Sequence, residues 1–280
     1  MKPFVISRPK AKSRKRWTFE GFLGIPYQAL IIVLIMIPIF LMLLYSFQSR
    51  ETSQTFTLIF TLDNYLRFIN EPIFVGLMAE SIGLAFVATL VSLVIGYPLA
   101  YIISKSHTKT KTLLILLITA PMWINMLLRT KALEQVLLML APELIGTNLA
   151  IIVGMTYVYL PFMVLPIYTV LSKIDVSLYE SASDLGANKL QTLIKVVIPL
   201  SISGVLSGIM MVFLPSATTL VVPKYLGAGR FLIGNLIENA MISQGDFGYG
   251  SSIALLMAGL ILVFLYAIKK VDKYTEGGDE

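Results

Sequence analysis

The chain has 280 residues, a formal net charge of +6 and a mean hydropathy of +0.81, and 56% of its residues are hydrophobic. This composition excludes an ordinary soluble domain, because most of the length falls in apolar runs long enough to cross a bilayer. There is no cysteine and His107 is the single histidine, which excludes disulfides, thiol chemistry, His-based metal clusters and Ser-His-Asp triads. We therefore expect no catalytic and no metal-binding residues.

The first 73 residues contain three segments of different character. Residues 1–22 are basic, which predicts a cytoplasmic tail that fixes topology; binding of anionic lipid or nucleic acid is the less favoured alternative. Residues 23–47 form an apolar run that is longer than a signal-peptide core and lacks a small-residue cleavage site, so we predict a retained, peripheral transmembrane helix. Residues 48–73 are polar and mixed, and we predict an extracytoplasmic segment.

The remaining apolar runs lie within residues 74–268 and predict a core of five transmembrane helices. The fifth run of the chain contains Gly204 and Gly208, spaced as in the small-x-x-x-small motif of tightly packed membrane helices. Residues 269–280 are predicted to be a cytoplasmic tail. The sequence thus predicts an all-α polytopic membrane protein with six transmembrane helices, and the five core runs cover approximately 74–103, 112–128, 148–171, 201–222 and 251–268.

Positive charge is distributed unevenly between alternate loops. Both ends and the segments 105–111 and 172–199 carry most of the 22 Lys and Arg residues, and the alternate loops carry few. Because cytoplasmic loops hold the excess of Lys and Arg, both termini and residues 172–200 are predicted to be cytoplasmic.

Residues 172–200 are polar although they lie between two apolar runs. Their stretch YESASDLGANKLQTLIKVVIPL reads as two amphipathic helical pieces with Gly186 as the breaker. An apolar face is predicted for Leu185, Leu190, Leu193 and Val197. We interpret this segment as a docking surface; the alternative is a solvated loop helix without a partner.

This stretch resembles the EAA loop of ABC importer permeases, which reads Glu-Ala-Ala, three residues, Gly, nine residues, Ile-x-Leu-Pro. Glu180, Ser181, Ala182, Gly186 and Pro199 stand at positions of the motif, and the departures keep the size class or come near it. The resemblance implies the MetI-like fold of a type I importer permease, with residues 172–200 as the coupling loop. The residues that it implies for ATPase docking are Glu180, Ser181, Ala182, Asp184, Gly186, Ala187 and Pro199.

The sequence contains no G-x-x-x-x-G-K-[ST] phosphate loop, so this chain is expected to bind no cofactor and to be no enzyme. The resemblance implies two copies of a cytoplasmic ABC ATPase that binds ATP and Mg²⁺. It further implies a second permease subunit, expected to be a paralogue, and an extracytoplasmic binding protein. The expected location is the inner membrane of a bacterium, in contact with lipid and not with nucleic acid.

Several blocks also resemble the PotB type of spermidine/putrescine permease, whose second permease is of the PotC type. They include FTLDNYLRFI at 60–69, APMWINMLLRTKAL at 120–133 and FLIGNLI at 231–237. A polyamine is therefore the expected substrate. Alternatives are a related permease for thiamine, ferric iron or sulfate, a polytopic membrane enzyme, or a channel.

A polyamine path needs aromatic faces, carboxylates and amide oxygens, because several ammonium groups sit on an apolar chain. Arg129 and Lys131 would repel such a substrate, so part of the acidic contact is expected from the second permease. The ordinary alternatives are interface aromatics and acids that pair with neighbouring helices. The predicted path residues are Trp123, Asn125, Tyr157, Tyr159, Glu80, Glu238 and Asp246.

Overall fold

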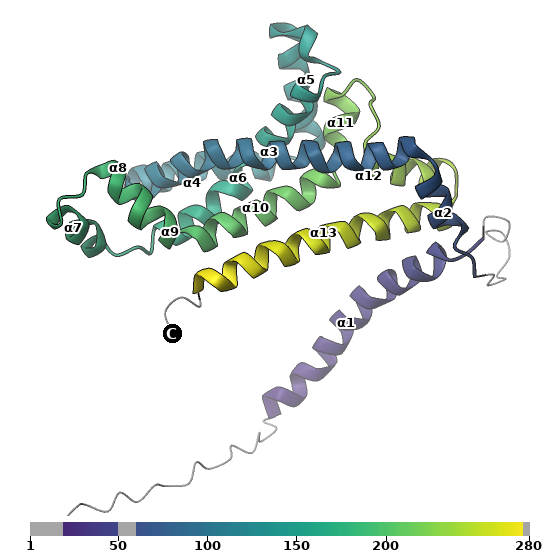
Figure 1. The fold of residues 1–280 in the computed structure, drawn as a ribbon, viewed down its shortest axis with the longest axis horizontal. Coiled ribbons are helices and arrows are strands. Elements are labelled where there is room, and N and C mark those ends of the chain that lie inside the picture. The colour runs from purple at the N-terminus through teal and green to yellow at the C-terminus, as the bar shows by residue number, and fades with distance from the viewer. Residues whose placement is uncertain (1–18, 50–59, 277–280) are drawn as a thin grey trace, which may run out of the picture.

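The computed structural model describes residues 19–49 and 60–276, and in these ranges the chain is a bundle of helices. Long helices run side by side along the longest axis of the molecule (Figure 1). Helix α6 lies at the centre, since it packs against α3 on one side and α10 on the other, and α13 packs against α10. The four helices are α3 (Pro72–Lys105), α6 (Asn148–Leu171), α10 (Ile202–Ala217) and α13 (Phe247–Glu276).

Each predicted apolar run corresponds to a helix or to a bent pair of helices. Helices α3 and α6 and residues Phe247–Lys270 of α13 are long and apolar enough to cross a membrane. Two further pairs qualify if each is one bent span: Thr108–Trp123 with Met126–Leu140, bent by 99°, and Lys189–Leu200 with Ile202–Ala217, bent by 66°. In α1 (Phe19–Ser46), residues Leu30–Ser46 form a shorter apolar helix. The predicted all-α membrane fold is confirmed.

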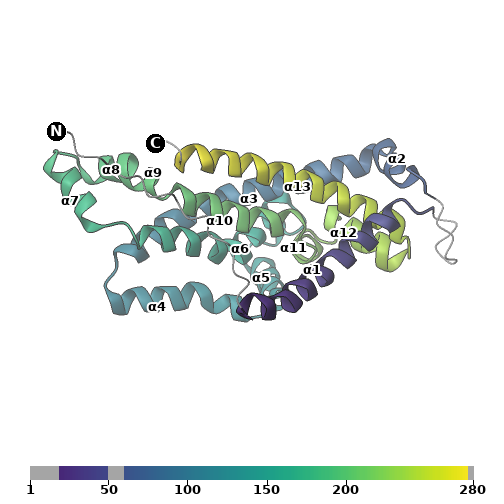
Figure 2. The same ribbon diagram turned by 90° about the horizontal axis from the view of Figure 1, so that it is seen from below.

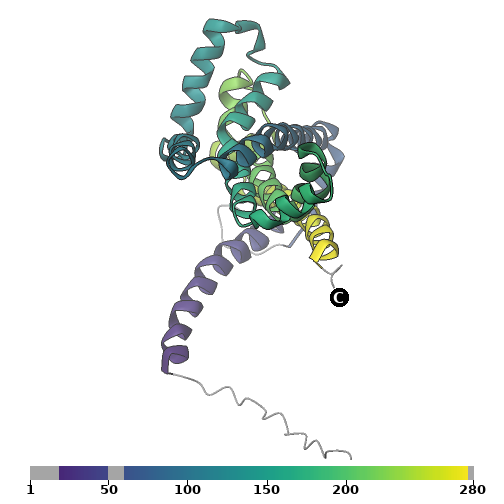
Figure 3. The ribbon, with the colours of Figure 1, turned by 90° about the vertical axis from the view of Figure 1, so that its left-hand side faces the viewer.

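The third apolar run is broken more sharply than its sequence suggests. Helix α4 (Thr108–Thr119) passes through a 3₁₀ turn at Ala120–Trp123 into α5 (Met126–Leu140). The third apolar run was expected to end at residue 128, and the helix does not end there, because α5 continues as a regular helix to Leu140. Its start is fixed by Asn125, whose side-chain oxygen accepts a hydrogen bond from Leu127 N at 2.8 Å. Helices α4 and α5 form an arm that stands away from the bundle (Figures 2 and 3).

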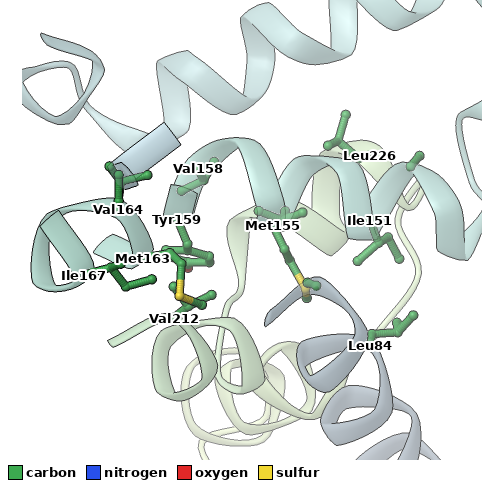
Figure 4. Packing of buried hydrophobic residues seen from close by; sticks show 14 of the residues in the cluster. Leu84, Ile151, Met155, Val158, Tyr159, Met163, Val164, Ile167, Val212 and Leu226 are labelled. Carbon is green, nitrogen blue, oxygen red and sulfur yellow. The ribbon is translucent and has the colours of Figure 1, made fainter. Parts of the chain in front are cut away.

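The core is built on α6. Met155, Met163 and Ile167 are fully buried between α3 and α10, and Figure 4 shows their side chains lining the α6 surface. The predicted close approach at Gly204 and Gly208 is confirmed, since an added Cβ would lie 3.0 Å from Pro166 O and 3.1 Å from Met163 O respectively. Small residues therefore let the α10 backbone touch α6, as in other tightly packed membrane helices.

The two ends of the bundle carry different short helices. At one end, which we call the coupling end, lie α7 (Val176–Asp184), α8 (Lys189–Thr192), a π-helical turn (Leu193–Val197) and α9 (Ile198–Leu200) (Figure 1). At the opposite end, the α2 end, lie α2 (Asp63–Asn70), α12 (Ile233–Glu238) and a π-helical turn (Asn239–Ser243). Helix α11 (Val221–Leu226) packs against α5 and α6.

Some boundaries differ from those of the apolar runs. The fifth run was expected to reach residue 222, but α10 ends at Ala217 near Pro215, and α11 follows. The sixth run was expected to end at 268, whereas α13 continues to Glu276. Polar side chains at a helix terminus do not stop the backbone hydrogen bonds, so hydropathy marks the span and not the helix. Residues 1–18 of the predicted tail 1–22 lie outside the described residues.

Candidate functional site

The coupling loop, residues 172–200, begins with a capped helix. The Asp175 side chain accepts a hydrogen bond from Ser177 N at 3.0 Å at the start of α7. Hydrogen bonds from the Ser177 backbone N–H and then its side chain hold the pKa of Asp175 below the ordinary value of an aspartate. The carboxylate thus stabilises the first turn of α7 as long as it is ionised.

Helix α7 ends at Gly186, which has a φ of +80°. Gly186 N donates to Ser183 O at 2.9 Å and Ala187 N donates to Ala182 O at 3.0 Å. These two bonds are the Schellman arrangement, in which a residue of left-handed conformation closes a helix, and glycine adopts that conformation without a Cβ penalty. The predicted breaker is confirmed, and the two-piece helical element follows from it.

The second piece is capped independently. Asn188 and Gln191 form a capping box, in which Gln191 N donates to Asn188 Oδ1 at 2.8 Å and Asn188 N donates to Gln191 Oε1 at 2.9 Å. The chain continues through the π-helical turn into α9, which contains Pro199, and bends by 66° into α10. At this bend the hydroxyls of Ser201 and Tyr97 of α3 lie 2.8 Å apart. The coupling loop is thereby joined directly to two spans.

The apolar side chains of the coupling loop divide into two groups. Val197 is fully buried and Leu193 is partly buried against the core, so both belong to the fold. Leu185 is 89% exposed and Leu190 is 64% exposed, although both are large and apolar. Large apolar side chains exposed on a short polar segment are available to a protein partner.

The predicted docking residues lie together around this surface. Glu180, Ser181, Asp184 and Gly186 are exposed, Ala182 is the buried residue of α7, Ala187 is half-buried, and Pro199 is exposed on α9. Glu180 makes no salt bridge within the described residues. Its charge is therefore available to a basic partner.

Tyr179, which the sequence analysis did not single out, attaches α7 to the bundle. Lys105 Nζ at the end of α3 lies 3.1 Å from the centroid of the Tyr179 ring. Burial, together with the nearby Tyr101 and Tyr97, raises the pKa of the Tyr179 phenol above its ordinary value. This cation–π contact positions α7 against α3, and no local sequence pattern indicates it, because 74 residues separate its partners in the chain.

At the α2 end, Glu80 of α3 and Glu238 of α12 lie near one basic residue. Arg230 donates from Nη2 to Glu80 Oε1 at 2.6 Å and from Nη1 to Asn148 Oδ1 at 2.5 Å. Glu80 is thus already paired with Arg230. Pairing with a neighbouring element was the ordinary alternative that the sequence left open for this acid. Arg230 was missed by sequence reasoning, since 150 residues separate it from Glu80.

Glu238 lines a cavity of about 380 Å³, which we call the outer pocket. Its wall contains the π-helical turn at Asn239–Ser243, and π-helical turns recur at functional sites. No salt bridge to Glu238 is found within the described residues. The outer pocket is lined by Lys224, Gly229, Arg230, Phe231, Asn235, Glu238, Asn239, Ile242 and Ser243.

Asp246 lies in a separate cluster at the start of α13. Arg67 of α2 contacts its carboxylate at 3.2 Å, and Tyr249 N donates to Asp246 Oδ1 at 3.1 Å. The Arg67 guanidinium also lies 4.1 Å from the centroid of the Tyr249 ring. Asp246 therefore joins α2 to α13 and caps a helix.

The predicted aromatics and Asn125 lie along the arm and α6. Tyr159 is buried, and its hydroxyl donates to Pro215 O at 3.3 Å and lies 3.9 Å from the sulfur of Met126, next to Asn125. Tyr157 is 41% exposed and Trp123 is 89% exposed. The structure thus groups Asn125 with Tyr159 and Glu80 with Glu238, and it keeps Asp246 apart from both groups.

Comparison with known proteins identifies the family of this chain. Residues 92–275 match the family described as binding-protein-dependent transport system inner membrane component. The spermidine/putrescine transport system permease proteins PotB of Haemophilus influenzae and of Escherichia coli K12 are 32% and 33% identical to it over 266 residues. These alignments cover 88% of this chain and 93% and 96% of the relatives.

Solved structures show the same fold at lower identity. A bacterial ABC transporter involved in the import of the acidic polysaccharide alginate superposes with a TM-score of 0.69 and 17% identity, covering 96% of this chain and 99% of that chain. The MetNI methionine ABC transporter gives a TM-score of 0.56 and 19% identity, covering 74% of this chain and 97% of that one. The chain therefore belongs to the inner membrane components of binding-protein-dependent transport systems, the permeases of ABC importers.

Proposed function

We propose that this chain is a permease subunit of an importer for polyamines such as spermidine and putrescine. The observation that carries the substrate class is the match to spermidine/putrescine permeases over almost the whole length of both chains. The coupling loop supports the ATP-driven mechanism, because it is a rigid, doubly capped element with exposed apolar side chains and a hydrogen-bonded joint to the spans.

The proposed assembly assigns a partner to each end of the bundle. The coupling end faces the cytoplasm and docks one of two ATPase copies, which bind ATP and Mg²⁺. The α2 end faces outward and meets the extracytoplasmic binding protein. A second permease, a paralogue of this chain, completes the translocation path in the bacterial inner membrane, and both termini lie in the cytoplasm.

The outer pocket is the proposed entry site for an ammonium group. Glu238 offers a carboxylate, Phe231 offers an aromatic face and Asn239 offers an amide oxygen, which are the groups that an alkylammonium chain requires. The charge of Arg230 is neutralised by Glu80 at 2.6 Å, which lowers its repulsion of a cationic substrate.

Trp123, Asn125, Tyr157 and Tyr159 are proposed to continue this path along the arm and α6. Pro121 and Pro161 accompany them, and broken or proline-containing helices are where transporters form internal sites. Asp246 is already paired with Arg67, so its charge is less available to substrate than that of Glu238.

Substrate transport is tested with the assembled importer in vesicles and radiolabelled spermidine. We expect uptake by the wild-type complex and at least a tenfold loss in Glu238→Gln, because the neutral amide still accepts a hydrogen bond but forms no ion pair with an ammonium group. Glu143→Gln, which changes an exposed acid outside the outer pocket, is the matched control and should transport normally. Uptake of thiamine or iron in place of spermidine would contradict the substrate, and normal uptake by Glu238→Gln would remove this residue from the path.

ATPase docking is tested at Gly186. Because Gly186 has a φ of +80°, a β-branched residue there costs at least about 1 kcal/mol of backbone strain, whereas asparagine tolerates this conformation. An added Cβ meets no atom within 4 Å in this chain, so any steric effect of a larger side chain must come from the docked partner. Gly186→Val and Glu180→Lys should remain in the membrane but lose ATPase co-purification and uptake, and Gly186→Asn should retain most of both. If all three variants hold the ATPase normally, the coupling loop is not the docking element.

A further inference from the structure

Arg129 of α5 is a charged side chain without a counter-ion in the part of the chain that the structure describes. It is 7% exposed, and its Nε and Nη1 atoms are buried with no hydrogen-bond partner among those residues. The guanidinium groups of Arg67 and Arg230, in contrast, both contact carboxylates. A buried and unpaired guanidinium is costly in any protein and more so within a membrane.

The position of Arg129 is the junction of three elements. One turn earlier in α5, the sulfur of Met126 lies 3.9 Å from the Tyr159 hydroxyl of α6, and that hydroxyl donates to Pro215 O of α10 at 3.3 Å. Arg129 itself is close enough to Tyr159 for its charge to act on the phenol. Figure 1 shows α5 leaving the bundle near the middle of its long axis, away from both ends.

Further polar groups around this junction lack partners. Thr156 lies one turn before Tyr159 on α6, and Ser216 follows Pro215. Both hydroxyls are buried without a hydrogen-bond partner among the described residues, and the two side chains are at most 7% exposed. Buried polar groups in proteins are almost always paired, so several orphans at one junction indicate that a group from outside this chain is missing.

The chemistry of the junction defines that group. A guanidinium is a cationic donor, and a carboxylate both accepts its hydrogen bonds and neutralises its charge. The proposed polyamine substrate is a cation and would be repelled. Lipid phosphates lie at the membrane surface, whereas helix α5, which carries Arg129, leaves the bundle away from both of its ends (Figure 1).

We infer that Arg129 receives a carboxylate side chain from the second permease, and this inference rests on the proposed heteromeric importer. The arm supports this source, because α5 turns 99° away from α4 and exposes large apolar side chains on either side of Arg129. Trp123 is 89% exposed, Leu128 61% and Met139 84%. A partner that covers this apolar surface brings its carboxylate to the guanidinium as part of the same interface.

The sign of the effect of Arg129→Gln separates this role from an ordinary structural one. In the isolated chain the substitution removes a buried unpaired charge, so the melting temperature should stay the same or rise. In the complete importer the substitution removes the guanidinium that binds the carboxylate. Co-purification of the second permease should therefore fall at least tenfold, and spermidine uptake should fall with it. Arg129→Lys keeps the charge but loses the bidentate geometry of the guanidinium. Its co-purification with the second permease should therefore lie between that of the wild type and that of Arg129→Gln.

Lys131→Gln is the matched control, because Lys131 already contacts Glu134 of its own chain at 2.7 Å and should leave co-purification unchanged when substituted. When the acids of the second permease are neutralised one at a time, a single one of these substitutions should reproduce the loss of co-purification. Combining that substitution with Arg129→Gln should cause no further loss. A lower melting temperature of isolated Arg129→Gln, or normal co-purification, overturns the inference. A wild-type complex that holds the second permease but transports no spermidine contradicts the proposed substrate alone, and one without a second permease contradicts both proposals.

Discussion

Two ion pairs among the described residues join elements that are distant in sequence. Arg67 and Asp246 connect α2 to α13, and Arg230 connects the segment before α12 to Glu80 of α3. Asp246 is only 3% exposed, so its charge depends on Arg67 and on the backbone N–H of Tyr249. A buried carboxylate that loses its partner bears the full cost of desolvation.

We therefore expect Arg67→Met to lower the free energy of unfolding by about 1.5–3 kcal/mol, the range for a hydrogen bond to a charged group. Glu71→Gln is the control, since Glu71 is 46% exposed and 3.9 Å from Arg67, and exposed pairs contribute little. A double-mutant cycle with Asp246→Asn in detergent-solubilised protein measures the coupling. Additive effects of Arg67→Met and Asp246→Asn would show that the two side chains do not depend on each other.

The sequence predicts the local structure of the coupling loop better than the tertiary contacts of the predicted path residues. Glu180, Gly186 and Pro199 stand in one continuous pattern, and the local hydrogen bonds of a capped helix follow from such patterns. Arg230 and Tyr179 find their partners 150 and 74 residues away, and no spacing rule connects such positions. Tertiary packing, which the sequence pattern does not contain, decides which acid remains unpaired.

At the scale of elements, helix packing depends on where glycine removes a side chain. Gly204 and Gly208 face α6, and an added Cβ at Gly208 would lie 2.8 Å from the sulfur of Met163 and 3.1 Å from its carbonyl oxygen. Gly83 of α3 has no atom within 4 Å of such a Cβ. Both glycines are helical, so they differ in packing and not in backbone conformation.

Gly208→Ala should destabilise the chain by about 1–3 kcal/mol, because the α10 backbone must move away from α6. Gly83→Ala should be neutral or stabilising, since alanine is favoured over glycine in a helix by about 1 kcal/mol. Thermal unfolding of the two purified variants in the same detergent tests the pair. Equal melting temperatures would contradict the close packing of α6 and α10.

The same scale explains which boundaries the sequence misses. Hydropathy locates the apolar runs, because a bilayer requires them, but it does not record where a helix bends. The 99° bend between α4 and α5 follows from a proline turn and an Asn125 cap. The charged residues of α5 end the apolar run, although the regular helix continues beyond them. Polar residues are compatible with a helix that leaves the bundle. The end of the apolar run at residue 128 therefore does not mark the end of the helix, which is at Leu140.

For the whole molecule, the two ends of the bundle differ in charge and in shape. The coupling end carries the lysines of segments 105–111 and 172–199 and exposes Leu185. The α2 end carries the outer pocket and the Arg67–Asp246 pair. Lys and Arg accumulate on the cytoplasmic side of membrane proteins, so this asymmetry predicts that the coupling end is cytoplasmic.

The orientation can be measured directly because the natural chain contains no cysteine. His107 is exposed at the coupling end, and Gln244 is exposed at the α2 end between α12 and α13. In intact cells an impermeant thiol reagent should label Gln244→Cys and not His107→Cys, whereas inside-out vesicles should give the reverse. Permeabilised cells, in which both variants should be labelled, control for the reactivity of each thiol. Labelling of His107→Cys from outside would place the coupling loop on the wrong side of the membrane for a cytoplasmic ATPase, and the proposed mechanism would then fail for the entire molecule.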